Sequence, residues 1–132
     1  MRSLELSGSS VNNAGLAALK ALPGLEYLGL SHTPIDDKGL ENVATLKHLY
    51  SLDLANRNIT DAGLRHLKSL GRLNWLRLTY SRVTDAGLAH LTALTELRTL
   101  ILDDTKVTDA GVLGLRRALP ELRVCTAPKA AP

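Results

Sequence analysis

A fixed spacing of 24 residues runs through the whole chain. One glycine recurs at this spacing five times, as Gly15, Gly39, Gly63, Gly87 and Gly111. Several apolar columns follow the same step. They are Leu25, Leu49, Leu73 and Leu97; Leu28, Leu52, Leu76 and Leu100; Leu30, Leu54, Leu78 and Leu102; and Ile35, Ile59, Val83 and Val107. A period of this length predicts a stack of repeated units, because one unit alone cannot bury its apolar face.

Two hydrophobic periods alternate within each repeat. In the segment 75–79 the leucines are two residues apart, which indicates a strand with one buried face. Leu88, Leu91 and Leu94 follow at intervals of three, which indicates a short helix that can include a 3₁₀ turn. The expected strands are 3–7, 27–31, 51–55, 75–79 and 99–103. The expected helices are 13–22, 37–46, 61–70, 85–94 and 109–118.

These elements predict an α/β solenoid. Strands that all run in one direction form a parallel sheet, and the wider helices on the other side make the stack curve with its strands on the concave face. We expect one domain over residues 1–127 with about five repeats, followed by a disordered tail at 128–132. After Ala118-Leu119-Pro120 the last strand is weakened, and we expect Cys125 to be a small buried residue there.

Two polar columns mark the start of each helix. An acidic column consists of Asp37, Asp61, Asp85 and Asp109, with Asn13 in the first repeat. We expect these side chains to cap their helices, because a side-chain oxygen accepts free N–H groups and a carboxylate suits the helix N-terminus. The glycine column implies close approach of a neighbouring group, since glycine otherwise weakens a helix. It matches no phosphate-binding loop.

Composition excludes several classes of protein. Of 132 residues, 29 are leucine and only four are aromatic, and the net charge of +3 is dispersed along the chain. Dispersed charge gives no basic stripe, so we expect no nucleic-acid partner. No apolar run reaches the length of a membrane helix and no leader follows Met1, so we expect a cytoplasmic protein without membrane contact. One cysteine permits no internal disulfide.

The repeat resembles the leucine-rich repeat. Its pattern L-x-x-L-x-L-x-x-[N/C]-x-L is met by Leu73-x-x-Leu76-x-Leu78-x-x-Ser81-x-Val83. The signature Thr-Asp-Ala-Gly-Leu at 60–64 and 84–88 looks like a bacterial subclass and is similar to the cysteine-containing repeats of F-box proteins. The resemblance implies a right-handed horseshoe that recognises proteins on its concave face. The chain departs from the family at the Asn/Cys position, where Arg57 cannot be buried and is expected to turn outward. That position reads Ser9, Thr33, Arg57, Ser81 and Thr105.

Three of the four aromatic residues fall on the predicted concave face. Leucine alone can fill the core, and Trp, Tyr and Arg are the residues that dominate binding energies. We therefore expect an anchor for a protein partner with a polar rim. The anchor is Tyr27, Trp75, Arg77 and Tyr80, the rim is Asp53, Asn56, Asp103 and Asp104, and His32 faces the same side near Asn56 and Tyr80. Covering of neighbouring strands by the same rings is the alternative. Asp53 and Arg77 are expected to form an exposed ion pair worth less than about 1 kcal/mol.

No constellation of residues predicts catalysis. The four histidines do not converge with a nucleophile, and HExxH, GxSxG and CxxC are absent, so we expect no enzyme, no metal and no cofactor. The favoured function is a protein-binding module. One alternative is an assembly element that self-associates through its open N-terminal edge, as a monomer or weak homodimer. Another, implied by the resemblance alone, is the substrate-recognition arm of a ubiquitin-ligase-like or effector protein, although this chain contains no F-box.

Overall fold

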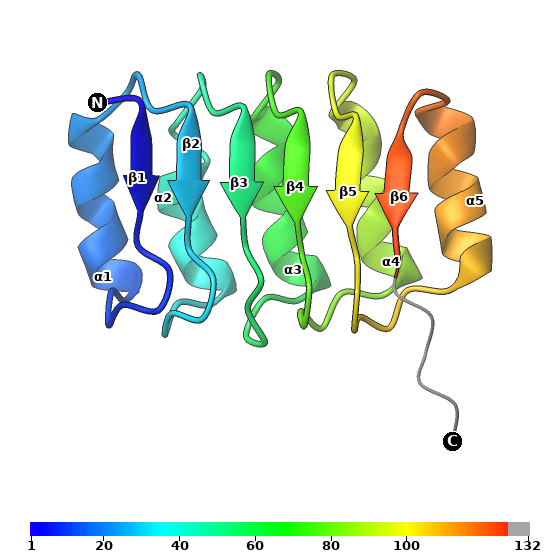
Figure 1. The fold of residues 1–132 in the computed structure, drawn as a ribbon, viewed down its shortest axis with the longest axis horizontal. Helices are drawn as coiled ribbons and strands as arrows, with labels where there is room; N and C mark the ends of the chain where they lie inside the picture. Colours follow the sequence, from blue (N-terminus) through cyan, green and yellow to red (C-terminus); the bar gives the residue numbers. More distant parts are fainter. Residues whose placement is uncertain (127–132) are drawn as a thin grey trace.

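The computed structural model describes residues 1–126 as one continuous stack of strands and helices (Figure 1). The strands are β1 (Ser3–Glu5), β2 (Tyr27–Gly29), β3 (Ser51–Asp53), β4 (Trp75–Arg77), β5 (Thr99–Ile101) and β6 (Arg123–Cys125). They form one six-stranded parallel sheet in sequence order. The predicted tail at 128–132 lies outside the described residues.

Each strand is aligned with the next at an offset of 24 residues. Leu28, Leu52, Leu76 and Leu100 are consecutive partners across the sheet. The five predicted strands are confirmed, and the weakened segment after Pro120 forms β6, which pairs with β5. Each strand is three residues long, and so ends two residues earlier than predicted. The alternation of apolar residues continues past the strand because the next leucine, such as Leu78, still points inward as the chain turns.

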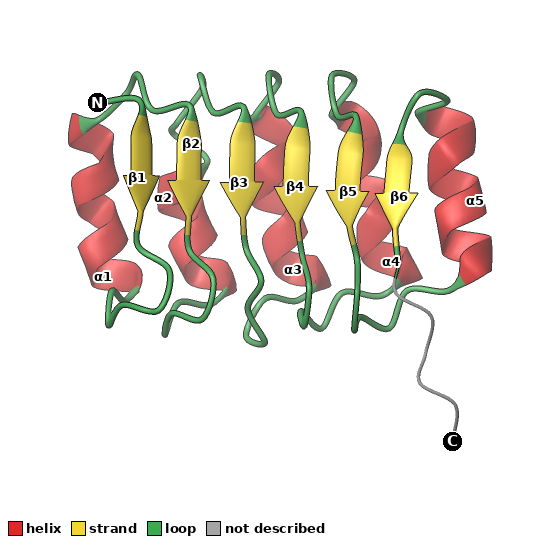
Figure 2. Cartoon of the chain, in the orientation of Figure 1, coloured by secondary structure: helices red, strands yellow, loops and turns green. Residues whose placement is uncertain are grey.

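The helices are short and lie on one side of the sheet, behind it in Figure 2. They are α1 (Asn13–Leu16), α2 (Leu40–Val43), α3 (Asp61–Leu64), α4 (Asp85–Leu88) and α5 (Asp109–Ala118). The first four are joined to the 3₁₀ turns Ala17–Ala21, Asp37–Gly39, Arg65–Ser69 and Ala89–Ala93, as the spacing of three predicted. The last repeat departs from that spacing, because Leu115 and Leu119 are four residues apart, and α5 is a continuous α-helix of ten residues.

The predicted leucine columns make up a single core between the sheet and the helices. The side chains of Leu52, Leu54, Leu76 and Leu78 have no exposed surface. Residues of the first repeat such as Leu4 are only partly buried against this core. Among the described residues β1 and β6 each pair on one side only, so self-association through the β1 edge stays a prediction. No helix within residues 1–126 has the length and apolar character needed to cross a membrane.

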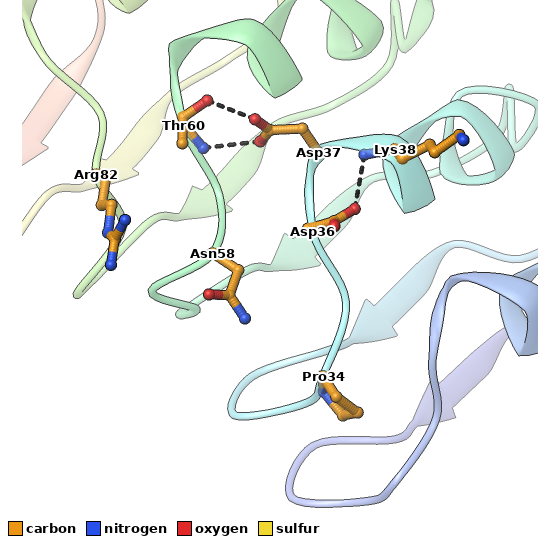
Figure 3. Close-up of a pocket in the computed structure, with 7 residues that line it drawn as sticks. All are labelled: Pro34, Asp36, Asp37, Lys38, Asn58, Thr60 and Arg82. Atoms are coloured by element: carbon orange, nitrogen blue, oxygen red, sulfur yellow. Dashed lines mark hydrogen bonds between the residues drawn. The ribbon is translucent and has the colours of Figure 1, made fainter.

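The acidic column joins successive repeats instead of capping its own helices, which corrects the prediction. The Asp37 carboxylate accepts two hydrogen bonds from Thr60 of the next repeat, one from the backbone N–H at 2.7 Å and one from the hydroxyl (Figure 3). Asp61 binds Thr84 in the same way, with its N–H at 2.7 Å. The third such pair is Asp85 with Thr108. The threonines and their equivalents occupy the N-cap positions.

The first of these contacts uses a different pair of side chains. Asp36 takes the place of the threonine, and the residue that binds it is Asn13 rather than an aspartate. The Asn13 amide donates to the Asp36 carboxylate at 2.6 Å, and its carbonyl accepts the Asp36 N–H at 3.1 Å. Replacing the threonine by an acid is therefore matched by replacing the aspartate with a neutral donor, which avoids two facing carboxylates.

The glycine column is explained by the same contact, as the sequence predicted from its close approach. A Cβ on Gly63 would overlap the Asp37 carboxylate, and a Cβ on Gly87 would overlap that of Asp61. Each glycine therefore makes room for the aspartate of the preceding repeat. The motif Thr-Asp-Ala-Gly thus contains both halves of the contact: Asp reaches forward to the next repeat, while Thr and Gly receive the previous one.

Candidate strand-face site

The helices leave one side of the sheet uncovered, and we call this side the strand face. Its first row alternates small and large side chains from strand to strand. The row is Ser3, Tyr27, Ser51, Trp75, Thr99 and Arg123. Tyr27 and Trp75 are half-buried, with Ser51 low between them. Because adjacent strands are about 4.8 Å apart, the two rings stand roughly 10 Å from each other. They are raised points on the strand face.

Glu5 holds the ring of Tyr27 in place. The Tyr27 hydroxyl donates to Oε2 of Glu5 at 2.6 Å, and the backbone N–H of Ser7 donates to Oε1 at 2.9 Å. Gly29 permits this arrangement, since a Cβ there would overlap the Glu5 carboxylate. Hydrogen bonds from Ser7 and Tyr27 lower the pKa of Glu5. The hydrogen bond to Glu5 and burial raise the pKa of Tyr27 to about 12. Tyr27 is therefore a fixed, neutral ring at any physiological pH.

This pair predicts a change of stability at high pH. Because the folded pKa of Tyr27 is raised from 10.0 to about 12, its contribution is complete below pH 10 and is lost as the pH rises toward 12. We expect the wild type to ionise one tyrosine later than Glu5→Gln does, since the neutral amide removes the facing charge. Tyrosinate absorbance, with Tyr27→Phe subtracted to isolate this ring, measures the difference. Identical titrations of the wild type and Glu5→Gln would contradict the assignment.

The predicted ion pair between Asp53 and Arg77 is confirmed, but it is more sheltered than expected. Nη1 of Arg77 lies 3.1 Å from Oδ2 of Asp53, and the two side chains are 34% and 13% exposed. Nε of Arg77 also donates to the hydroxyl of Thr79 at 3.3 Å. The other oxygen of Asp53 accepts the Ala55 N–H at 3.2 Å. Arg77 is thus held on three sides against the sheet, which fixes its orientation before any partner arrives.

Asn56 lies inside the protein, so its predicted place on the polar rim is wrong. Its side chain is 5% exposed, and Nδ2 donates to the Thr33 carbonyl at 2.8 Å and, at 3.4 Å, to that of Leu30. The physical reason is its neighbour Arg57, which is exposed as predicted. The long charged side chain cannot fill the buried polar position of this repeat, so Asn56 does. The third row was also expected outward, but Ser31, Ala55 and Thr79 are buried.

His32 and Tyr80 meet above this altered repeat. Their ring centroids are 5.8 Å apart and the ring planes are tilted by 43°, although the two residues belong to repeats that are not adjacent. Both have left-handed backbones, with φ of 54° for His32 and 68° for Tyr80. The prediction that His32 lies near Tyr80 is confirmed. The site therefore has two parts: Tyr27, Trp75 and Arg77 over the strands, and the His32–Tyr80 pair at the turns that follow them.

The remaining predicted residues lie at the far end of the same face. Asp103 is half-buried and Asp104 is exposed, and the Asp103 carbonyl accepts the Tyr80 N–H at 3.1 Å. Cys125 is exposed, not buried as predicted. It stands in the second row at the edge of the sheet, and no seventh strand covers it within the described residues.

Sequence reasoning missed Glu5, although Gly29 in the same row signals a large neighbour. It also missed two open hollows away from the strand face. One of about 590 Å³ lies at the turns that precede the helices (Figure 3). It is lined by Pro34, Asp36, Asp37, Lys38, Asn58, Thr60 and Arg82. Its acidic groups are already bonded within the fold, as the dashed lines in Figure 3 show.

The second hollow, of about 380 Å³, lies before the strands and includes Tyr50, whose side chain is 54% exposed. Tyr50 is the fourth aromatic residue and the only one away from the strand face. Arg72 there lies 3.2 Å from Nδ1 of His48. Within residues 1–126, no three or more His, Cys, Asp and Glu side chains are grouped so that they could hold a metal ion.

Comparison with known proteins agrees with this architecture. The family model described as Leucine Rich repeat matches residues 23–44, which span β2, the following turn and α2. A search of curated proteins finds no match. With its single parallel sheet and alternating short helices, the chain is a leucine-rich-repeat protein. Members of this class commonly bind proteins and are typically non-catalytic. The bacterial subclass stays a prediction.

Proposed function

We propose that the strand face binds a protein partner, with Tyr27, Trp75, Arg77 and Tyr80 as its anchor. The observation that carries the proposal is the way these large side chains are held. Tyr27 is fixed by Glu5 and Arg77 by Asp53. A side chain that is ordered before binding loses less conformational entropy when the partner docks. Aromatic and arginine side chains of this kind supply most of the energy of protein interfaces.

The shape of the first row also favours a protein partner. Tyr27 and Trp75 rise on either side of Ser51, and Thr99 borders Trp75 on the next strand. A partner segment lying across the strands would contact both rings and place a side chain over Ser51. The polar atoms nearby are already paired within the fold, so docking leaves no buried charge without a partner. We propose that the chain acts by binding alone, without catalysis.

The proposal is tested by capturing partners from the source organism. Immobilised wild type, the double variant Trp75→Ala/Tyr80→Ala and the control Tyr50→Ala are compared by quantitative mass spectrometry. We expect a set of proteins retained by the wild type and by Tyr50→Ala but reduced at least about tenfold by the double variant, because each hot-spot truncation costs about 2 kcal/mol or more. Tyr50 is an exposed aromatic residue off the strand face. The same set on all three proteins contradicts the proposal, provided circular dichroism shows all three folded.

Two finer versions of this function rest on resemblance alone. They are a substrate-recognition arm of a ubiquitin-ligase-like protein and an effector that imitates one. Identification of the captured proteins separates them from other binding roles, because a ligase component or its substrate would be retained with the wild type and lost with Trp75→Ala/Tyr80→Ala.

A further inference from the structure

The turn after each strand places unusual residues in the left-handed region of backbone space. The position is occupied by Gly8 (φ 76°), His32 (φ 54°), Tyr80 (φ 68°) and Asp104 (φ 58°) in four of the repeats. A residue with a Cβ is disfavoured in this conformation, and a bulky one such as tyrosine most of all. The third repeat, with Asn56 turned inward, does not share it.

The fold does not require side chains at this position. Gly8 makes the turn with a backbone N–H bond to the Ser31 carbonyl at 2.8 Å. His32 and Tyr80 make the equivalent bonds, at 3.2 Å and 3.1 Å. Glycine therefore serves the turn equally well and without strain. Strained residues concentrate where function requires their side chains. All three side chains are exposed at the rim of the strand face, where a partner can reach them.

Their order along the rim defines a chemistry. Tyr80 stands between His32, whose ring it contacts at 5.8 Å, and Asp104, which follows on the next repeat. Equivalent positions of adjacent repeats are about 4.8 Å apart. Within residues 1–126 the Asp104 carboxylate forms no ion pair. An aromatic ring beside a carboxylate suits a planar cation, which stacks on the ring and donates hydrogen bonds to the carboxylate.

We infer that Tyr80 and Asp104 bind an arginine side chain of the protein partner, with His32 supporting the ring from the other side. This inference rests on the proposed function and adds the chemistry of the partner. The guanidinium lies against the face of Tyr80 that is turned away from His32, and its N–H groups point to the Asp104 carboxylate. Arginine fits this arrangement better than lysine, because its charge is spread over a plane that can stack and donate two parallel hydrogen bonds.

The first test uses the full chain and a small probe. N-acetyl-arginine amide is titrated into isotope-labelled protein while backbone amide spectra are recorded, with N-acetyl-citrulline amide as a neutral probe of the same shape. We expect saturable shifts at His32, Tyr80 and Asp104 with the arginine probe and about tenfold weaker shifts with citrulline. Equal shifts with both probes, or saturable shifts elsewhere only, would overturn the inference.

Variants separate binding from folding. Asp104→Asn is expected to weaken arginine binding about tenfold, whereas Glu96→Gln, which removes the same charge at the opposite edge of the sheet, leaves it unchanged. Asp104→Gly is expected to abolish binding while it raises the urea midpoint, since glycine relieves the left-handed strain. Unchanged arginine binding in Asp104→Gly contradicts the assignment. A lower midpoint in Asp104→Gly contradicts the strain on which it depends.

Partner capture shows which proposal fails. If proteins are lost with Trp75→Ala but retained with Asp104→Asn, the strand face binds a partner and the arginine site is wrong. If neither single variant changes the captured set, the proposed function fails as well. Loss with both variants supports the two together.

Discussion

Replacing Leu76 with alanine is expected to lower the free energy of unfolding by about 3–5 kcal/mol. Leu76 has no exposed surface and lies in β4, between Leu52 on one side and Leu100 on the other. Its removal leaves a cavity that the neighbouring leucines cannot fill, because each is held in its own column. The loss is large for a domain whose total stability is of the order of 5–15 kcal/mol. Urea denaturation followed by circular dichroism measures it.

The matched control is the same substitution at an exposed leucine. Leu113 lies in α5 with 54% of its side chain exposed, so Leu113→Ala is expected to change stability by less than about 0.5 kcal/mol. Repeats in a stack are stabilised mainly by their neighbours, so damage in the central repeat affects both sides of it. A loss below about 1 kcal/mol in Leu76→Ala would mean that the central columns repack freely.

The architecture could be predicted because the 24-residue period reports burial directly. Leu52, Leu76 and Leu100 occupy equivalent positions in sequence and are register partners in the sheet. The ends of the strands could not be predicted in the same way. A period of two records which side chains point inward, and Leu78 points inward although β4 ends at Arg77. Strand ends depend on backbone hydrogen bonds, which the apolar pattern does not record.

The candidate site was predicted less completely, because its residues do not repeat. Extrapolating the columns placed Tyr27, Trp75 and Arg77 correctly on the uncovered face. It failed for Asn56, where one substitution at Arg57 changes which of two neighbours is buried. The order Asn-Arg in place of a residue followed by Ser or Thr is the signal in the sequence that this repeat differs. Cys125 failed for a related reason, since burial in a stack requires a following repeat.

The polar contacts between repeats were the hardest to predict. Asp61 was expected to serve its own helix because capping is a local interaction that sequence spacing describes well. In the structure its carboxylate binds Thr84, 23 residues away. The recurrence of Thr, Asp and Gly together at one spacing is compatible with both arrangements. Only the stacking distance between helices decides between them.

Replacing Gly87 with alanine is expected to lower the free energy of unfolding by about 1–3 kcal/mol, although alanine is the better helix former. The new Cβ would overlap the Asp61 carboxylate and approach the Asp61 backbone, so this side chain must leave its two hydrogen bonds to Thr84. Gly114→Ala in α5 is the matched control. A Cβ there meets nothing within 4 Å, so Gly114→Ala is expected to raise stability by about 0.5–1 kcal/mol.

A double-mutant cycle identifies the cause of the effect at Gly87. Asp61→Ala removes the carboxylate and is expected to cost about 1–3 kcal/mol by itself, because the Thr84 N–H loses its partner. In that background Gly87→Ala no longer displaces anything and should be neutral or stabilising, which gives a coupling energy of at least about 1 kcal/mol. Equal costs of Gly87→Ala in both backgrounds would show that the contact between repeats is not why this position is glycine. Coupling of the expected sign would explain why Asp and Gly recur together at 24 residues: each glycine accommodates the aspartate of the repeat before it.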